Sequence, residues 1–163
     1  NHIHEGTWAI HGIDILGRKV RMAEGAALEM LRAEMLATIE SAKQYSALAR
    51  HCQQLHDAFG LIDQTIAAVA KADDASLALA NATIFLDAMG HVVIAWMWLK
   101  QSVAAYKGQA LGSSDDAAFY SGKIAACNFF YRYELPKIEA NLDLVASLDS
   151  TCFDLSAEQF VGV

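Results

Sequence analysis

The chain has 163 residues, of which 55% are hydrophobic, and 19 acidic against 12 basic side chains give it a formal net charge of −7. This length suits one domain with a substantial core, and the lack of a basic patch argues against nucleic-acid binding. Cys52, Cys127 and Cys152 are an odd number of cysteines at unrelated spacings, which favours a reduced, cytoplasmic protein over a disulfide scaffold.

The N-terminal end has neither the basic region nor the apolar run of a secretory signal. Because the first residue is Asn1 rather than methionine, we expect the chain to begin inside a larger gene product. A single proline and many alanines favour long helices throughout.

Helical spacing of apolar residues predicts three helices in the first half of the chain. The first covers residues 7–20 and has Thr7 as its N-cap. The second covers residues 26–42, and the third covers residues 44–72, with Gly60 in its middle.

The fourth and longest predicted helix, residues 75–107, is apolar nearly all round and should therefore be central in the fold. Its segment 77–99 is long enough to cross a bilayer. However, it contains Asn81, Asp87 and His91, and an aspartate near the centre of a span costs roughly 2.5–3.5 kcal/mol. We favour a buried core helix with no membrane span; a small membrane protein is the alternative.

Glycine, serine and aspartate mark residues 108–116 as a loop. A fifth helix begins near residue 116 and runs through the aromatic segment 129–133. Pro136 then either starts a sixth helix or kinks a continuous one. With no strand pattern anywhere in the sequence, the prediction is an all-α, antiparallel helical bundle of about five to six helices.

The first twenty residues carry the pattern most specific to a function. It reads His4-Glu5-Gly6-Thr7-Trp8-Ala9-Ile10-His11 and continues as Asp14-Ile15-Leu16-Gly17-Arg18-Lys19. This resembles the catalytic loop of the acyl-CoA dehydrogenase family, in which Glu-Gly-Thr, two variable residues and Ile-Gln open a helix. The continuation is similar to the branch with an additional C-terminal helical domain, as are three later segments, Ala118-Phe119-Tyr120-Ser121-Gly122-Lys123, Asn128-Phe129-Phe130-Tyr131 and Glu134-Leu135-Pro136.

The resemblance implies α,β-dehydrogenation of an acyl-CoA thioester with FAD as cofactor. Glu5 matches the family's catalytic base, which removes the α-proton while a hydride passes to the flavin. Glu5 and Gly6 would contact the substrate, and Thr7, Trp8 and His11 would contact the cofactor. His11 departs from the pattern, since it stands where the family has glutamine. Trp8 departs as well, because it is bulky where the family often has a small or polar residue.

The same resemblance divides the chain into three parts. Residues 1–21 would be the catalytic-glutamate loop with its helix, 22–149 the additional bundle, and 150–163 a tail. Most of the FAD site would lie in parts of the protein outside this chain. The expected partners are an acyl-CoA substrate, an electron acceptor of unknown identity, and further copies in a homodimer or higher homo-oligomer.

The setting of Glu5 makes chemical sense for a base. A carboxylate on a loop before a helix can be aimed at a substrate carbon, and the adjacent Gly6 allows a flat ligand to approach closely. A glutamate before a helix is nevertheless often only a favourable partner of the helix dipole. The alternative function is therefore a non-catalytic helical oligomerisation or interaction module.

Other polar residues are interpreted as structural. Cys52 and His56 have the spacing of a zinc pair, but two ligands are too few, so no metal site is predicted. His91 is interpreted as a satisfied core histidine.

Two further expectations concern packing between helices. Asp87 and Asn81 need polar partners if they are buried, and we expect Lys123 or Arg132 on the fifth helix to supply them. The aromatic segment 129–133 is expected to contribute to a subunit interface.

Overall fold

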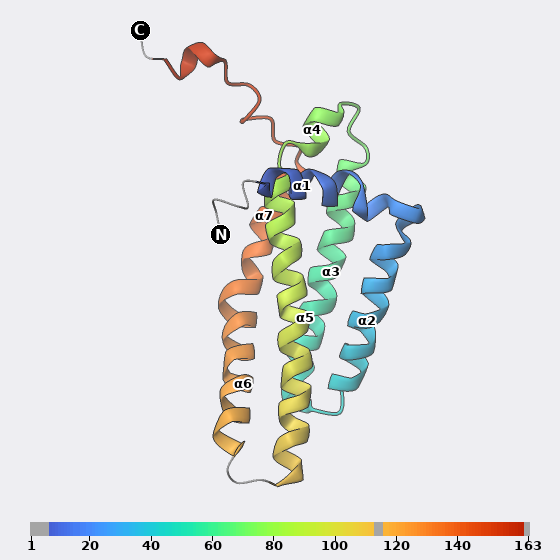
Figure 1. Cartoon of the computed structure of the whole chain (residues 1–163), viewed down its shortest axis with the longest axis vertical. Helices are drawn as coiled ribbons and strands as arrows, with labels where there is room; N and C mark the ends of the chain where they lie inside the picture. The colour runs from blue at the N-terminus through green and yellow to red at the C-terminus, as the bar shows by residue number, and fades with distance from the viewer. Residues whose placement is uncertain (1–6, 113–115, 162–163) are drawn as a thin grey trace.

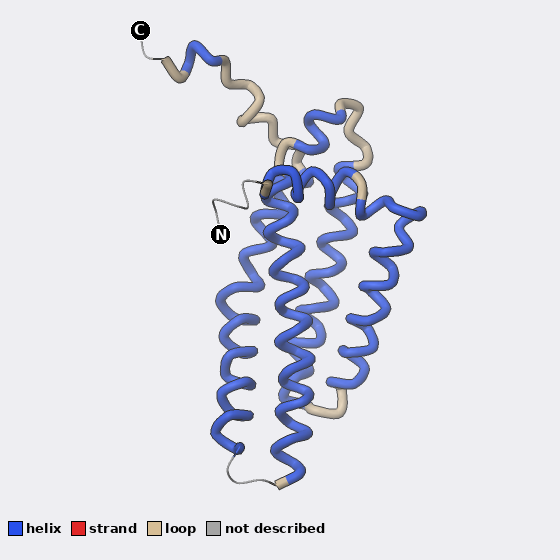
Figure 2. Tube along the Cα trace, viewed as in Figure 1, coloured by secondary structure: helices blue, strands red, loops and turns tan. Residues whose placement is uncertain are grey.

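The computed structural model describes residues 7–112 and 116–161, and these residues form helices and turns without a strand (Figures 1 and 2). Four long helical rods run antiparallel to one another and build the bundle (Figure 1). They are α2 (Ala26–Ala42), α3 (Ala49–Val69), α5 (Ala82–Leu111), and α6 (Ala117–Phe129) followed by α7 (Ile138–Ala146). The all-α bundle is confirmed, with slightly fewer helices than expected.

One short helix, α1 (Trp8–Gly17), lies across the end of the bundle where α5 begins (Figure 1). The helix predicted over residues 7–20 therefore ends earlier, at Gly17. A 3-10 segment, Lys19–Gly25, follows, and its last three residues have positive φ angles between 49° and 87°. This left-handed segment turns the chain from α1 into α2.

The helix predicted over residues 75–107 is divided in two. A short α4 (Ala75–Leu79) begins at Asp74, whose side chain accepts a hydrogen bond from the Ser76 N–H. After a turn at Asn81, α5 continues beyond the predicted end to Leu111. By contrast, α3 continues through Gly60, because a single glycine costs a helix only about 1 kcal/mol and the buried residues around it hold the helix in place.

Pro136 lies within a helical run that continues from α6 to α7, and it also stands in the first turn of a 3-10 segment that begins at Leu135, so both predicted alternatives stay open. Proline lacks an N–H group and clashes with the carbonyl four residues earlier. The run accommodates it with a π-helical turn, Phe130–Glu134, and a 3-10 turn, Leu135–Lys137. Wider and tighter turns thus replace the regular α-helical hydrogen bonds around the proline.

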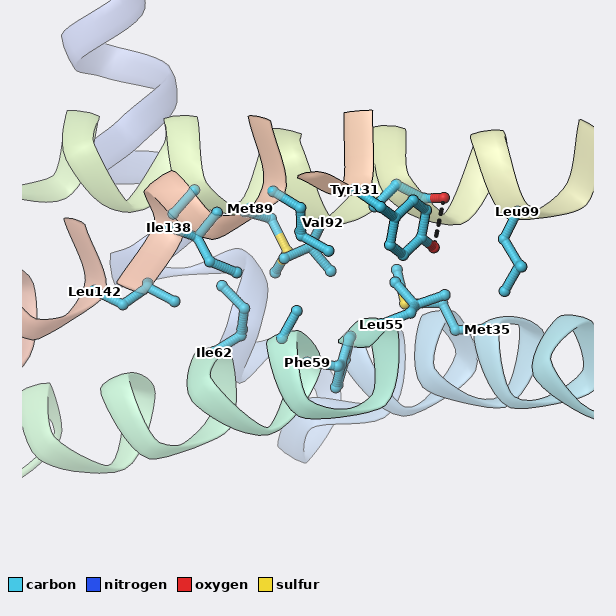
Figure 3. Packing of buried hydrophobic residues seen from close by; sticks show 14 of the residues in the cluster. Met35, Leu55, Phe59, Ile62, Met89, Val92, Leu99, Tyr131, Ile138 and Leu142 are labelled. Atoms are coloured by element: carbon cyan, nitrogen blue, oxygen red, sulfur yellow. Dashed lines mark hydrogen bonds between the residues drawn. The ribbon is translucent and has the colours of Figure 1, made fainter. Parts of the chain in front are cut away.

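The core lies between α5 and the surrounding rods (Figure 3). Phe85, Val92 and Leu99 of α5 are fully buried, as are Leu55 and Ile62 of α3. Each such side chain stabilises the fold by about 1.5–3 kcal/mol relative to its exposed state. Facing residues from α2, the π-helical turn and α7 complete the cluster; they include Met35, Ile39, Tyr131, Ile138, Leu142 and Val145.

The segment Ala75–Leu111 is the one stretch of the described residues that is long and apolar enough to cross a membrane. In this fold, however, α5 contacts α1, α2, α3, α6 and α7 and contributes buried residues along its length. This central position is the one expected of a core helix. Length and composition alone are weak support for a span.

The predicted partners of Asn81 are wrong. Its side-chain amide donates to the backbone oxygen of Asp149 at 2.9 Å, because the break before α5 places Asn81 at the end of the bundle. Lys123 instead donates to the side chain of Gln101 at 3.1 Å. The expected pairing required Asn81 to lie within a helix opposite α6.

The predicted partners of Asp87 are also wrong. Its side chain is 46% exposed, and its carboxylate lies 3.8 Å from Nδ1 of His91, so water and a neighbouring imidazole solvate it. His91 is satisfied, as expected, since Nδ1 donates to the Asp87 backbone oxygen at 2.9 Å. Its Nε2 lies 3.9 Å from a carboxylate oxygen of Glu134.

Candidate functional site

The predicted catalytic and substrate-binding residues, Glu5 and Gly6, lie outside the described residues. The described part of the site begins at Thr7, directly before α1. The described part of the candidate site therefore consists of the three residues predicted to contact the cofactor, Thr7, Trp8 and His11, and of the packing contacts that hold α1 in place.

Thr7 occupies the N-cap position of α1 but makes no side-chain capping hydrogen bond. Its hydroxyl instead lies 3.0 Å from Nε2 of His11, one turn along the helix. Both groups are near the surface, so the start of α1 presents a hydroxyl and an imidazole side by side. These groups donate and accept hydrogen bonds, which suits a hydroxyl or phosphate of a flavin nucleotide.

Trp8 turns most of its side chain to the surface and is 55% exposed. Ile10 and Ile13 are exposed by 63% and 49%, so much of the outward surface of α1 is apolar. No described part of the chain covers this surface, which is available to another part of the protein. A large accessible indole also suits contact with a flat cofactor.

The inward side of α1 is packed tightly against the start of α5. A Cβ atom at Gly12 would lie 2.8 Å from the carbonyl carbon of Ala82 and 2.9 Å from the nitrogen of Thr83. Leu16 is 1% exposed and joins the core on the same side. The absence of a side chain at Gly12 therefore lets two backbones touch and fixes α1 across the bundle end.

An ion pair lies at the end of α1. Arg18 Nε donates to the Asp14 carboxylate at 2.5 Å. The hydrogen bond from Arg18 lowers the pKa of Asp14. The Arg18 side chain is 65% exposed and that of Asp14 is 30% exposed, so solvent screens the pair and it adds little stability.

The zinc pair considered from the sequence is not assembled. The thiol of Cys52 is buried and points to the backbone oxygen of Ile39 at 3.8 Å, while the His56 side chain is 64% exposed. Within the described residues, no group of three or more histidine, cysteine or acidic side chains could hold a metal ion.

The aromatic segment 129–133 is divided between core and surface. Tyr131 is 1% exposed, and its hydroxyl donates to the backbone oxygen of Ala95 at 3.0 Å (Figure 3). Phe129 and Tyr133 are each 56% exposed and lie with ring centroids 5.0 Å apart. Helix periodicity accounts for this division, because residues four apart share a helix face whereas the residue midway between them points to the opposite side.

Beside this turn lies a cavity of about 470 Å³ that sequence reasoning missed. It is formed by α3 on one side and by the end of α6 with the π-helical turn on the other; its lining residues are Arg50, His51, Gln54, Asn128, Tyr131, Arg132 and Pro136. The spacing of Arg50, His51 and Gln54 on one helical face was the signal available in the sequence.

Comparison with known proteins identifies the family. A family model described as "Acetyl-CoA dehydrogenase C-terminal like" matches residues 31–156. A broad-specificity linear acyl-CoA dehydrogenase of Mycobacterium tuberculosis is 26% identical over 97% of this chain and 27% of its own length. A butyryl-CoA dehydrogenase of Syntrophomonas wolfei is 27% identical over 96% of this chain and 26% of its own length.

A third relative, a 3-methylmercaptopropionyl-CoA dehydrogenase of Ruegeria pomeroyi, is 32% identical over 85% of this chain and 24% of its own length. The chain thus spans about a quarter of the length of these curated relatives and matches their C-terminal part. Together with the helical bundle and the family match over most of the sequence, this shows that the chain belongs to the acyl-CoA dehydrogenase family, as a C-terminal helical region.

Proposed function

We propose that the complete protein containing this chain is an FAD-dependent acyl-CoA dehydrogenase that oxidises an acyl-CoA thioester to the 2,3-enoyl-CoA. The observation that carries the proposal is the Glu5-Gly6-Thr7 motif directly before α1, in a chain that belongs to this family. The acyl-CoA dehydrogenase names of three relatives support the same reaction class.

In this proposal the Glu5 carboxylate removes the α-proton of the acyl group. Bound FAD would supply the acceptor for the β-hydride, so that loss of the α-proton and of the hydride would leave the C2–C3 double bond; Thr7, Trp8 and His11 are the residues of this chain that would contact it. The backbone N–H of Glu5 donates to the thioester carbonyl and stabilises the negative charge that develops there. Gly6 has no side chain to hinder the approach of substrate and flavin.

The described residues support a positioning role for α1. Gly12 and Leu16 hold its inward side against the bundle, and a fixed helix start limits the conformations open to the preceding loop. Thr7 and His11 offer polar contacts to the cofactor, and Trp8 offers an accessible ring. His11 replaces the family's glutamine with another side chain that can donate a hydrogen bond.

The proposal extends to partners and setting. An electron acceptor reoxidises the flavin, the protein is a homodimer or higher homo-oligomer, and it is cytoplasmic. The exposed pair of Phe129 and Tyr133 supports a contribution of the aromatic segment to a subunit interface.

The decisive variant is Glu5→Gln in the complete protein, because it keeps the size of the side chain and removes the base. We expect turnover of acyl-CoA to fall by a factor of about 10²–10⁴, the range typical of a lost general base. Flavin absorbance should be retained. Glu34→Gln is the matched control, because Glu34 is exposed on α2 and makes no ion pair within the described residues.

If Glu5→Gln turns over as fast as the unchanged protein, Glu5 is not the base. The non-catalytic helical module then becomes the better account of this chain. A protein purified from its complete reading frame without flavin absorbance would favour that same alternative.

A further inference from the structure

The cavity between α3 and the π-helical turn carries a concentration of positive charge. Arg50 of α3 and Arg132 of the π-helical turn line it from opposite sides, and His51 of α3 is also among the lining residues. Gln54 and Asn128 add side-chain amides, and no aspartate or glutamate is among the lining residues. The side chains of Arg50, Arg132, Gln54 and Asn128 all carry N–H groups that donate hydrogen bonds.

Both arginines lack an acidic partner among the described residues. The ion pairs within 4.0 Å in that part of the chain involve other cations, and none includes Arg50 or Arg132. Arg132 makes only a weak contact with the ring of Tyr133, at 5.9 Å from the centroid. Two guanidinium groups are thus available to a ligand.

The surroundings make this charge unusual. The chain as a whole carries a formal net charge of −7, which on average repels anions. The adjoining hollows between α3 and α7 are lined by Asp57, Glu139 and Asp143 instead. Asp57 lies seven residues beyond Arg50 on α3, about 10 Å along the helix, so salt at physiological concentration weakens the attraction between the two charges.

The wall of the cavity is fixed rather than loose. The buried Tyr131 ties the π-helical turn to α5 through its hydrogen bond to Ala95 (Figure 3). Gln54 reaches across from α3 and donates to the Tyr131 backbone oxygen at 3.4 Å. The His51 ring packs edge-on against the Tyr131 ring, with ring centroids 4.6 Å apart.

We propose that this cavity binds a phosphate group, with Arg50 and Arg132 as the two guanidinium contacts and Gln54 and Asn128 as neutral donors. Planar guanidinium groups form paired hydrogen bonds with the oxygens of phosphates and carboxylates. Donors on both walls suit a tetrahedral anion with several oxygens better than a single carboxylate. A π-helical turn beside the site agrees with the frequent occurrence of such turns at functional positions.

Two ligands can supply the phosphate group: coenzyme A, through one of its phosphates, or a free phosphate ion. Tyr131 bonds to Ala95, which lies thirteen residues beyond Ala82, so about 20 Å along α5 separates the cavity from α1. An extended coenzyme A chain can cover such a length. The site itself does not depend on the proposed dehydrogenase reaction.

The experiment is isothermal titration of the complete protein, in a phosphate-free buffer, with inorganic phosphate, coenzyme A and dephospho-coenzyme A. Arg50→Gln and Arg132→Gln should each weaken phosphate binding roughly tenfold, since a hydrogen bond to a charged group accounts for at least that factor. Arg50→Lys should lose part of the affinity, because it keeps the charge and loses the planar fork. Arg21→Gln removes the same charge from an exposed position outside the cavity and should leave binding unchanged.

Both cavity arginines are exposed, so their substitution should leave the melting temperature unchanged. If the glutamine variants bind phosphate and coenzyme A more weakly than the unchanged protein but bind dephospho-coenzyme A equally well, the occupant is the 3′-phosphate of coenzyme A. Weaker binding of phosphate alone assigns the free ion. If phosphate does not bind the unchanged protein, or binds both glutamine variants equally well, the proposal is overturned. Because the phosphate titration requires no turnover, its outcome is independent of the Glu5→Gln result.

Discussion

Replacing Gly12 with alanine tests whether backbone contact fixes α1 on the bundle. The added Cβ would lie 2.8 Å from both the carbonyl carbon and the oxygen of Ala82. Carbon atoms in contact prefer separations of about 3.5–4.0 Å, so the two helices must separate by roughly 1 Å or the backbone must distort. The contacting atoms belong to the backbone of α5 and cannot rotate away.

Two opposing effects decide the magnitude. An alanine in a helix is intrinsically more favourable than glycine by about 0.5–1 kcal/mol. Overpacking against fixed atoms costs about 1–3 kcal/mol. We therefore expect Gly12→Ala to lower the free energy of unfolding by up to about 2.5 kcal/mol. Gly60→Ala and Gly90→Ala are the controls, because a Cβ at either helical position meets nothing within 4 Å.

The measurement is urea-induced unfolding of the three variants, followed by circular dichroism. The controls should gain about 0.5–1 kcal/mol, because only the intrinsic preference acts on them. Equal stabilisation by Gly12→Ala would refute the close contact between α1 and α5. In the complete protein proposed above, Gly12→Ala should also lower acyl-CoA turnover, since the displaced helix directly follows the proposed catalytic motif in the sequence.

Two further predictions concern the residues beside the cavity. Tyr131→Phe should lower the free energy of unfolding by about 0.5–1.5 kcal/mol, because it removes the buried hydrogen bond to Ala95. Tyr133→Phe, at the surface, is the control and should cause no measurable change in the same unfolding assay. Burial and the neighbouring charge of Arg50 lower the pKa of His51 from its ordinary 6.5, so the unfolded chain binds this proton more readily. The free energy of unfolding should therefore decline as the pH falls below about 6.5, and His51→Gln should remove that part of the decline. The measurement is unfolding of both proteins at pH 7.5 and at pH 5.5 in phosphate-free buffer. An unchanged pH dependence in the variant would contradict the lowered pKa.

The periodicity of apolar residues was sufficient to predict the rods of the bundle. Leu55, Phe59 and Ile62 recur at helical spacing, and all three are buried on one side of α3. A helix with such a pattern is stable when its apolar side packs against other helices and its polar side faces water. Helix ends were predicted less accurately because turns such as the one at Asn81 depend on contacts with distant residues, here Asp149.

The candidate site was only partly accessible to the sequence. The motif at Glu5 can be recognised because its residues are consecutive. For the cavity, the sequence shows only the polar residues on one face of α3, because Arg50 and Arg132 lie far apart in the chain and line the same cavity only when α3 packs beside the π-helical turn. The wrong partners of Asp87 have the same origin, since the facing residues depend on a helix register that the sequence pattern does not determine.

The packing of α1 gives a physical reason why the Glu5-Gly6-Thr7 motif and the helical bundle occur together in one chain. A ten-residue helix is marginal on its own in water, so its structure depends on what it packs against. Gly12 and Leu16 provide that contact on one side, while Trp8 and Ile13 leave apolar surface on the other. A helix bound on one side and open on the other can join the bundle to a further part of the protein. We therefore infer that the bundle acts as a rigid support for the proposed catalytic loop, and that loosening the support at Gly12 should affect turnover even though no residue of the loop is changed.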